Sequence, residues 1–439
     1  MTFPSLPERF QVEYLAPSFI TPDEDNPRTR ATRHIKALAK SISEFGFNVP
    51  VLVDDNTRLI AGHGRLEAAK LLGLTEIPAL RLRHLDDHQR RAFMIADNRL
   101  HDLSSWNRNK LGEILLNLAE ADIGFDVEAT GFSLGEIDLM IVEGDGGNSD
   151  KDNAVPEPGP VVAVPGDLFI LGGHMVACAD ACAQPSYDLL MADLRADLVA
   201  TDPPFNVPMK GHVTGLGKVV HRPFVEGNGE WSEAEFTAFL ARAIALTAQF
   251  SRDGSLHYWA MDWRHQHELN LAARGVYDEQ VNLCVWSKTA GGMGSFYRSQ
   301  HELFSVWRKG RERHRNNVQL GQFGRNRTNV WKYPGANSTG HSGEEGNLLA
   351  LHPTVKPVAL VADILLDSTK RGDVVLDPFL GSGTTIIAAE KVGRRARGLE
   401  LDPRYVDTII RRWQLWTGEQ ARRADGILFD DIEPRQPSD

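Results

Sequence analysis

The sequence has 439 residues, which exceeds one ordinary domain and predicts two or three. Hydrophobic residues make up 42% and charged residues 24%, as in globular proteins, and no apolar run approaches the roughly 20 residues that a membrane-spanning helix needs. Cys178, Cys182 and Cys284 give no disulfide framework and no zinc-ligand spacing, and no secretory signal is present. We therefore expect a cytoplasmic protein with no metal site and no membrane contact.

The net charge of −11 does not favour a polyanionic partner, so binding to nucleic acid would need a local basic surface. The segment from Lys288 to Lys332 supplies one, because only Glu302 and Glu312 oppose its basic side chains. Its arginines are Arg298, Arg308, Arg311, Arg313, Arg315, Arg325 and Arg327. A basic run is equally typical of a solvated loop face, so both interpretations stay open at this point.

Residues 1–105 show a compact α/β pattern. LVDD, LIAG and IPALRLR predict short strands, while HIKALAKSISEFG and GRLEAAKLLG predict helices. In the first helix Ile35, Leu38 and Ile42 recur at helical spacing, and Gly46 ends it. These features predict a small first domain.

The sequence AGHGR places Gly62, His63, Gly64 and Arg65 where the second of these helices begins. Exposed amide groups and a guanidinium at a helix N-terminus suit a phosphate group. Together with NPR, IKALAKSISEFG and ADNRL, this pattern resembles the amino-terminal domain of ParB-like partition proteins and sulfiredoxin. The resemblance implies a loop that binds a nucleotide (CTP) or contacts DNA. His63 and Gly64 replace the acidic and basic residues that are usual there, so a domain that contacts DNA without a ligand is the alternative.

Residues 106–160 are acidic. KLGEILLNLAE predicts an amphipathic helix, and EGDGGNSDKDNAVPEPGPV has the composition of a flexible linker. We therefore expect a connector, with a second domain at 161–439.

Strand and helix patterns alternate through residues 161–439. DLVATDPP, SLHYWAMD, VNLCVWSK, LFSVWRKG, DVVLDPF and RARGLEL predict strands, and three amphipathic helices lie among them. Such alternation predicts an α/β fold with a mostly parallel, Rossmann-like sheet covered by helices on both faces.

The segment VVLDPFLGSGTTIIAAE runs from a buried strand through Asp377 and a turn with Gly381 and Gly383 into a helix that begins at Thr384. Glycines at such a turn let a ligand approach the backbone, at the strand ends where open α/β sheets bind ligands. A complete pyrophosphate-binding glycine motif is absent. Glu400 ends the next strand, where a carboxylate can accept both hydroxyl groups of a ribose.

The segment DLVATDPPFNV places Asp202 at the end of an apolar strand, followed by Pro203, Pro204 and Phe205. The prolines stop the strand and fix the direction of nearby carbonyl groups. The Asp202 carboxylate and a carbonyl, most simply that of Pro203, can accept the two hydrogens of an amino group on a base. Phe205 offers a flat face for stacking of an extruded base.

TDPPF, DPFLGSGTT, HPTVKP and GLELDPRY together resemble the amino-group DNA methyltransferases of the class whose catalytic motif precedes the cofactor motif. The resemblance implies S-adenosylmethionine as cofactor and a catalytic role for residues 202–205. It implies a target-recognition region at about 288–332, where the arginines would contact double-stranded DNA. The implied cofactor-binding residues are Asp180, His352, Thr354, Lys356, Asp377, Phe379, Gly381, Gly383, Thr384 and Glu400.

In this family an aspartate before Pro-Pro is usual for enzymes that methylate N6 of adenine, so we expect that activity from Asp202. N4 of cytosine is the close alternative, and a ParB-like DNA-binding regulator with an inactive methyltransferase domain is an alternative of another class. No nuclease motif accompanies the pattern, which favours a solitary modification enzyme over a restriction system. A homodimer is a further expectation.

Overall fold

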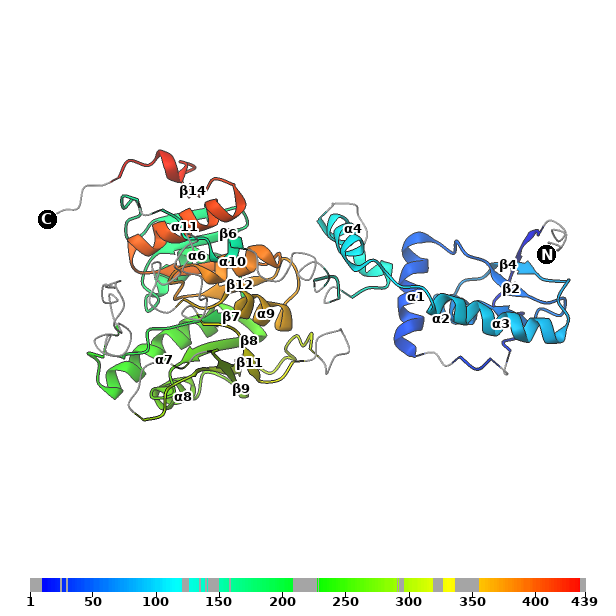
Figure 1. Ribbon diagram of the computed structural model, residues 1–439, viewed down its shortest axis with the longest axis horizontal. Helices are drawn as coiled ribbons and strands as arrows, with labels where there is room; N and C mark the ends of the chain where they lie inside the picture. The colour runs from blue at the N-terminus through cyan, green and yellow to red at the C-terminus, as the bar shows by residue number, and fades with distance from the viewer. Residues whose placement is uncertain are drawn as a thin grey trace. The chain divides into compact units, whose positions relative to one another are not determined.

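The structure is a computed structural model, which describes residues 10–434 except 24–25, 29–30, 121–125, 134–135, 139, 141–149, 158, 208–226, 228, 290, 292–295, 319–326 and 336–354. The chain divides into two compact units, Met1–Gly144 and Asp145–Asp439, each with its own sheet (Figure 1). In the described part of the chain, no helix has the length and apolar character needed to cross a membrane.

The amino-terminal unit is built on a sheet with the strand order β1-β4-β2-β3. β2 and β4 run parallel, whereas β1 and β3 are antiparallel to their neighbours. The elements of this unit are β1 (Val12–Leu15), α1 (Thr32–Phe45), β2 (Val51–Val53), β3 (Leu59–Ala61), α2 (His63–Leu71), β4 (Ile77–Arg81), α3 (Asp87–Asp102), α4 (Arg108–Glu120) and η1 (Val127–Thr130).

One hydrophobic cluster joins this sheet to its helices. Val51, Leu66 and Ile77 are fully buried in it and come from β2, α2 and β4. α1 ends where its sequence predicts, because Gly46 adopts a φ of 84° and its N–H group donates to Ile42 O. The strands and helices predicted for this unit are therefore present.

A small helical cluster occupies much of the region whose composition predicts a connector. Leu115 of α4 and Ile137 are buried together at its centre. Lys40 of α1 lies 2.7 Å from the carboxylate of Asp126, which ties the cluster to the rest of the amino-terminal unit. Apolar residues within this acidic stretch thus suffice to bury a small core.

The carboxy-terminal unit is built on a sheet with the strand order β11-β9-β10-β8-β7-β12-β13-β6-β5-β14. The central strands β8, β7, β12, β13 and β6 run parallel, and β10 and β5 reverse direction on either side of them. The strands are β5 (Leu168–Leu171), β6 (His174–Cys178), β7 (Ala196–Thr201), β8 (Ser251–Met261), β9 (Glu279–Ser287), β10 (His301–Arg308), β11 (Val330–Lys332), β12 (Val374–Asp377), β13 (Arg395–Glu400) and β14 (Arg422–Arg423).

Helices cover both faces of this sheet. Phe236 of α7 packs with Trp259 of β8 on one face. Neighbouring residues of a strand point to opposite faces, so Tyr258 points to the other face, where its hydroxyl bonds Ser368 of α9. The Rossmann-like fold class is thereby confirmed. The helices are η2 (Asp150–Asn153), α6 (Gln184–Met191), α7 (Glu233–Gln249), α8 (Gln266–Ala273), α9 (Val358–Ser368), α10 (Thr384–Lys391), α11 (Pro403–Thr417) and η5 (Phe429–Asp431).

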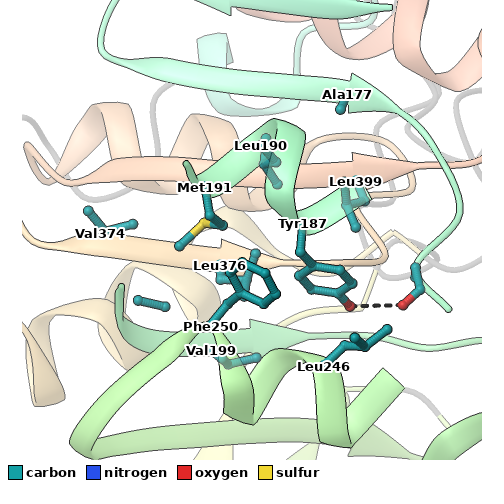
Figure 2. Close-up of a cluster of buried hydrophobic side chains, with 12 residues drawn as sticks. Ala177, Tyr187, Leu190, Met191, Val199, Leu246, Phe250, Val374, Leu376 and Leu399 are labelled. Atoms are coloured by element: carbon teal, nitrogen blue, oxygen red, sulfur yellow. Dashed lines mark hydrogen bonds between the residues drawn. The ribbon is translucent and has the colours of Figure 1, made fainter. Parts of the chain in front are cut away.

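A buried cluster beneath α6 aligns the central strands (Figure 2). Tyr187 stacks on Phe250 with 5.4 Å between ring centroids, and its hydroxyl donates to Ala181 O at 2.9 Å. Val199 of β7 lies in register with Leu376 of β12, and both are fully buried. Burial of each large apolar side chain contributes about 1.5–3 kcal/mol. The cluster therefore fixes the carboxyl ends of β7 and β12 beside each other.

Candidate active site

Asp202 follows β7 directly, at the carboxyl end of that strand. Pro203 and Pro204 come next and cannot donate to the hydrogen-bond ladder of the sheet. The Asp202 side chain is 23% exposed, and its Oδ2 atom lies 2.5 Å from Lys356 Nζ. Its Oδ1 atom is buried and has no hydrogen-bond partner among the described residues. One carboxylate oxygen is therefore held by a cation and the other is available.

The charges around Asp202 oppose one another. Burial raises the pKa of Asp202 to about 6, against the lowering effect of Lys356, and Glu302 adds to the rise. Burial lowers the pKa of Lys356, but the attraction of Asp202 and Glu302 is stronger and raises it overall. At neutral pH the site therefore holds a cationic lysine beside an aspartate that titrates unusually close to neutrality.

Asn206 supports the turn that carries the two prolines. It adopts a φ of 52°, in the left-handed region, where a short amide side chain is tolerated. Its Nδ2 atom donates to Trp231 O at 2.9 Å, and its Oδ1 atom accepts from Gly229 N at 3.1 Å. A Cβ atom at Gly227 would lie 2.6 Å from Pro204. The turn is thus packed against the backbone that leads into α7.

Asp377 ends β12 and organises the turn that follows. Its Oδ1 atom accepts from Thr201 Oγ1 at 2.7 Å and from Phe379 N at 3.1 Å, and its Oδ2 atom accepts from Thr385 Oγ1 at 2.6 Å. Burial raises the pKa of Asp377. Both oxygens bond the protein, so Asp377 shapes the turn, and it also lines the cavity. Its predicted contact with the cofactor stays a prediction.

The glycine turn between β12 and α10 borders the cavity at Gly381 and is packed against α11 at Gly383. Gly381 and Gly383 adopt φ values of 53° and 80°, and Gly383 is the N-cap of α10. A Cβ atom at Gly383 would lie 2.9 Å from Ile409, so a larger residue would displace the turn. Thr384 Oγ1 donates to Lys356 O at 3.3 Å, which links this turn to the lysine beside Asp202.

Glu400 and Asp180 extend the site along the sheet. Glu400 ends β13 and accepts hydrogen bonds from Asp402 N at 3.0 Å and Gly381 N at 2.9 Å. Burial raises the pKa of Glu400 to about 7. Asp180 lies two residues beyond β6, and its Oδ1 atom accepts from Cys182 N at 2.7 Å. Both carboxylates line the cavity that Asp202 lines.

Four acidic residues therefore lie at or just beyond the carboxyl ends of four neighbouring strands, β7, β12, β13 and β6. Neighbouring strands lie about 4.8 Å apart, so the row extends roughly 14 Å. An elongated ligand with hydroxyl and amino groups matches such a row. Most of the predicted residues come together here, since the cavity is lined by Asp180, Thr201, Asp202, Pro203, Pro204, Phe205, Lys356, Asp377, Phe379, Gly381, Thr384, Glu400 and Tyr405, among others.

Sequence reasoning missed a buried acid next to this row. Glu302 lies in β10 with its Oε2 atom 2.9 Å from Lys356 Nζ and its Oε1 atom 2.5 Å from Lys288 Nζ. Lys356, which is among the predicted cofactor-binding residues, lines the cavity, and its Nζ atom pairs with Asp202 and Glu302. The available signal was a single acid within the apolar strand LFSVWR and its flank.

Some of the predicted DNA-contacting arginines lie at the opposite edge of the sheet. β10 runs antiparallel to β8, so Arg308, the last residue of β10, is in register with Leu256, the middle residue of β8. The chain then passes beside Gly254, whose N–H group donates to Lys309 O. β7 has six residues, so the two edges are about 20 Å apart. Arg308, Arg311, Arg313 and Arg315 are thus on or near the edge opposite Asp202, and their predicted contact with DNA stays a prediction.

Arg327 is a structural residue in this fold. Its side chain is 18% exposed and lies 2.7 Å from Asp363 and 2.8 Å from Asp367, both in α9. Two carboxylates hold this guanidinium against α9, which favours a structural role. Its predicted contact with DNA stays a prediction. Three other predicted residues lie outside the described residues, namely Arg325, His352 and Thr354.

Exposed aromatic side chains follow β9 at the carboxyl edge of the sheet. Phe296 and Tyr297 are 84% and 87% exposed, and their ring centroids are 4.3 Å apart. Arg298 follows them and donates to Gly291 O at 2.8 Å. Trp307 and Trp331, from the same basic segment, are buried. Only part of this segment therefore presents aromatic and basic groups on the edge where Asp202 lies.

The predicted phosphate loop of the amino-terminal unit lies at the start of α2. Gly62 is its N-cap with a φ of 98°, and His63 and Gly64 are buried in the first turn. Arg65 Nη1 donates to Val49 O at 2.6 Å, and burial lowers the pKa of Arg65. The guanidinium thus braces the loop against the preceding backbone.

Family comparisons agree with this geometry. Residues 196–411 match the DNA methylase model of the N6/N4 methyltransferase family. The carboxy-terminal unit is an N6/N4 DNA methylase domain. Its matched segment runs from β7 to α11 and so contains Asp202, the glycine turn and Glu400. The methyl donor of this family is S-adenosylmethionine.

The amino-terminal part of the chain matches two further models. Residues 5–99 match the ParB N-terminal domain, and residues 109–165 match the helix–turn–helix domain of ParB-methyltransferases. The second match covers the helical cluster around α4, in the region whose composition predicted a connector. This DNA methylase domain therefore follows a ParB-like domain and a helix–turn–helix domain.

Individual relatives share the methylase domain. The Type II methyltransferase M2.DpnII of Streptococcus pneumoniae is 27% identical over 229 residues, which cover 49% of this chain and 81% of that protein. The crystal structure of the M1.HpyAVI–SAM complex is 20% identical and covers 54% of this chain and 98% of its own, with a TM-score of 0.38. The cytosine-N4-specific PvuII DNA methyltransferase is 14% identical and covers 60% and 97%, with a TM-score of 0.41.

Proposed function

We propose that the protein transfers a methyl group from S-adenosylmethionine to N6 of adenine in double-stranded DNA. The observation that carries this proposal is one cavity lined both by Asp202, whose Oδ1 atom has no partner among the described residues, and by Glu400 with the Gly381 turn. The first group suits an amino nitrogen and the second suits a nucleoside.

The cavity has the donor and acceptor pattern that this cofactor needs. When bound, S-adenosylmethionine supplies an electrophilic methyl group on a positively charged sulfur. Glu400 would accept hydrogen bonds from the ribose hydroxyl groups, since its backbone bonds leave lone pairs on both oxygens. The turn at Gly381 has no side chain to block close approach. Asp180, at the far end of the row, is placed to accept from an adenine amino group.

Asp202 prepares the amino nitrogen of the target base. Its Oδ1 atom accepts one hydrogen of the amino group, and the Pro203 carbonyl accepts the other. These bonds withdraw the nitrogen lone pair from conjugation with the ring and direct it at the methyl carbon. Methylation of this nitrogen would require the loss of one amino proton, and Asp202, whose pKa of about 6 suits a transient acceptor, is placed to take it.

The target base must leave the duplex to reach this cavity. Phe205 lines the cavity and can stack on the extruded base, a contact worth about 1–3 kcal/mol. Lys356 Nζ lies 5.3 Å from the centre of the Phe205 ring, so the cation that holds Asp202 also positions this platform. Phe296, Tyr297 and Arg298 lie on the same edge of the sheet, where the duplex would approach.

N4 of cytosine is the second candidate. The N6/N4 family includes both activities, and PvuII methyltransferase, a structural relative, is cytosine-N4-specific. An aspartate before the two prolines favours adenine. The intact set of Asp202, Gly381 and Glu400 argues against a DNA-binding regulator with an inactive methylase domain.

For the amino-terminal domain we propose DNA contact that supports the methylase. Nucleotide binding at the α2 N-terminus, a homodimer and a solitary role without a partner nuclease stay predictions.

Transfer of labelled methyl groups to DNA tests the proposed function. Wild-type protein should label duplex DNA, and digestion to nucleosides should place the label on N6-methyladenine. The Asp202→Ala variant should not label DNA although it still binds cofactor. Label on N4-methylcytosine would select the second candidate, and retained activity in the variant would overturn the assignment of Asp202.

A further inference from the structure

Four side chains of alternating charge lead from β9 to the catalytic carboxylate. Lys288 lies 2.5 Å from Glu302, Glu302 lies 2.9 Å from Lys356, and Lys356 lies 2.5 Å from Asp202. The four residues come from separate places in the sequence, namely the end of β9, β10, the segment before α9 and the end of β7. Their assembly therefore depends on the folded sheet and not on local sequence.

The middle of this chain of charges is buried. The side chains of Lys356 and Glu302 are 7% and 10% exposed, and the rings of Phe205 and Trp286 lie 5.3 Å and 5.9 Å from Lys356 Nζ. Removing charges from water is costly, and an ion pair in such a place often contributes little net stability. The buried Lys356, shared by two carboxylates, is thus better explained by a role in positioning Asp202 than by a contribution to stability.

We propose that Glu302 is a positioning residue for methyl transfer, which holds Lys356 on one oxygen of Asp202 and so leaves the other oxygen to the substrate amino group. This inference rests on the proposed function. It extends the active site to β10, a strand that the cavity lining reaches only at Phe304.

The hydrogen-bonding capacity of the lysine explains why two carboxylates are needed. An ammonium group has three N–H bonds and rotates freely when it has one partner. Contacts with Asp202 and Glu302 fix Lys356 Nζ at two points. Lys288 in turn fixes the second oxygen of Glu302, and its own main chain is paired with Gln300. Asp202 Oδ2 therefore has one defined cationic partner.

Neutralising either neighbour should shift the titration of Asp202 in opposite directions. The charged groups that face Asp202 are Lys356 before α9, Glu302 of β10 and Asp377 of β12. Glu302→Gln removes a negative charge and leaves Lys356 to Asp202 alone, so the pKa of Asp202 should fall. Lys356→Met removes the only nearby cation among these groups, so that pKa should rise.

The experiment measures the titration of Asp202 and the rate of methyl transfer in the full-length protein. Carbon-13 NMR of labelled aspartate carboxyl groups follows Asp202, whose signal is assigned by its loss in Asp202→Asn. Relative to wild type, the midpoint should fall by about one pH unit in Glu302→Gln and rise by about one in Lys356→Met. Under single-turnover conditions the acidic limb of the pH–rate profile of Glu302→Gln should also move to lower pH. The maximal rate of this variant should fall about tenfold or more.

Lys309→Met is the matched control. Lys309 pairs with Asp253 at 2.6 Å on the opposite edge of the same sheet, so this variant loses a lysine–aspartate pair without touching Asp202. It should leave both readouts unchanged. An unshifted Asp202 midpoint together with a wild-type rate in folded Glu302→Gln would overturn the positioning role. Shifted midpoints in the two variants, together with a wild-type protein that methylates no DNA, would uphold the charge arrangement while overturning the proposed function.

Discussion

The two edges of the carboxy-terminal sheet differ in how their residues are assembled. At the carboxyl edge, four acidic residues lie at or just beyond the ends of four neighbouring parallel strands and line one cavity, namely Asp202, Asp377, Glu400 and Asp180. At the opposite edge, Arg308 and the arginines after it follow a strand that runs the other way. Residues at the carboxyl ends of parallel strands lie on the same edge of the sheet. A run of charged residues does not by itself show on which edge it lies.

The largest expected effect on the rate of methyl transfer comes from comparing one carboxylate on each edge of the sheet, Asp202 and Asp253. Asp202→Asn should slow methyl transfer by roughly 10²–10⁴-fold, because the amide cannot accept the amino proton. Asp253→Asn, which breaks the ion pair with Lys309 on the other edge, should change the rate less than about twofold. Single-turnover rates and calorimetric cofactor titrations measure both. Equal losses in the two variants would contradict the assignment of the edges.

Glu400 should make cofactor binding depend on pH. Burial raises its pKa to about 7, and only the ionised form can accept from both ribose hydroxyl groups. Affinity should therefore rise with pH and level off above about pH 7, with a fall of about tenfold for each pH unit well below it. Calorimetry from pH 5.5 to 8.5 measures this profile, and Glu400→Gln should bind weakly with a flatter one. An unchanged profile in Glu400→Gln would mean that another group titrates.

Phe296 and Tyr297 should speed methylation only when the target base is paired. If they stack on the opened duplex, changing both to alanine should slow methylation of a paired target about tenfold or more. A mismatch at the target, which lowers the cost of extrusion, should restore most of the rate. Cofactor affinity is the control and should not change. Equal slowing on paired and mismatched DNA would exclude a role in opening the duplex.

The arginines of the opposite edge should have the smallest effect. Changing Arg311, Arg313 and Arg315 together to alanine should alter DNA affinity less than about twofold. Arg298→Ala should weaken binding and reduce its dependence on salt by about one phosphate contact. Binding titrations at graded salt compare the two variants. A larger loss of DNA affinity in the triple variant would place the duplex on the edge of the sheet opposite Asp202.

Much of this fold and site could be predicted from the sequence. Asp202, the Gly381 turn and Glu400 each sit where an apolar strand ends, so strand patterns alone bring them to one edge. The direction of β10 could not be predicted in this way, because it depends on how the chain between Ser287 and His301 returns. The edge on which Arg308 lies follows from the direction of β10, so it could not be predicted either.

The partners of buried charges were also beyond the sequence. Lys356 lies 154 residues from Asp202 along the chain, and Glu302 joins them only after β10 pairs with β8. Composition failed differently at α4, where Leu115 and Ile137 bury a small core within an acidic stretch. Few apolar residues suffice there, so the average charge of a segment is a poor guide to its structure.

A crystal structure with bound S-adenosylmethionine tests the central claim most directly. The ribose hydroxyl groups should lie on Glu400 and the sulfonium methyl group should face Asp202, with the cofactor along the row of strand ends. A cofactor bound with its ribose away from Glu400, or with its methyl group turned from Asp202, would contradict the proposed active site.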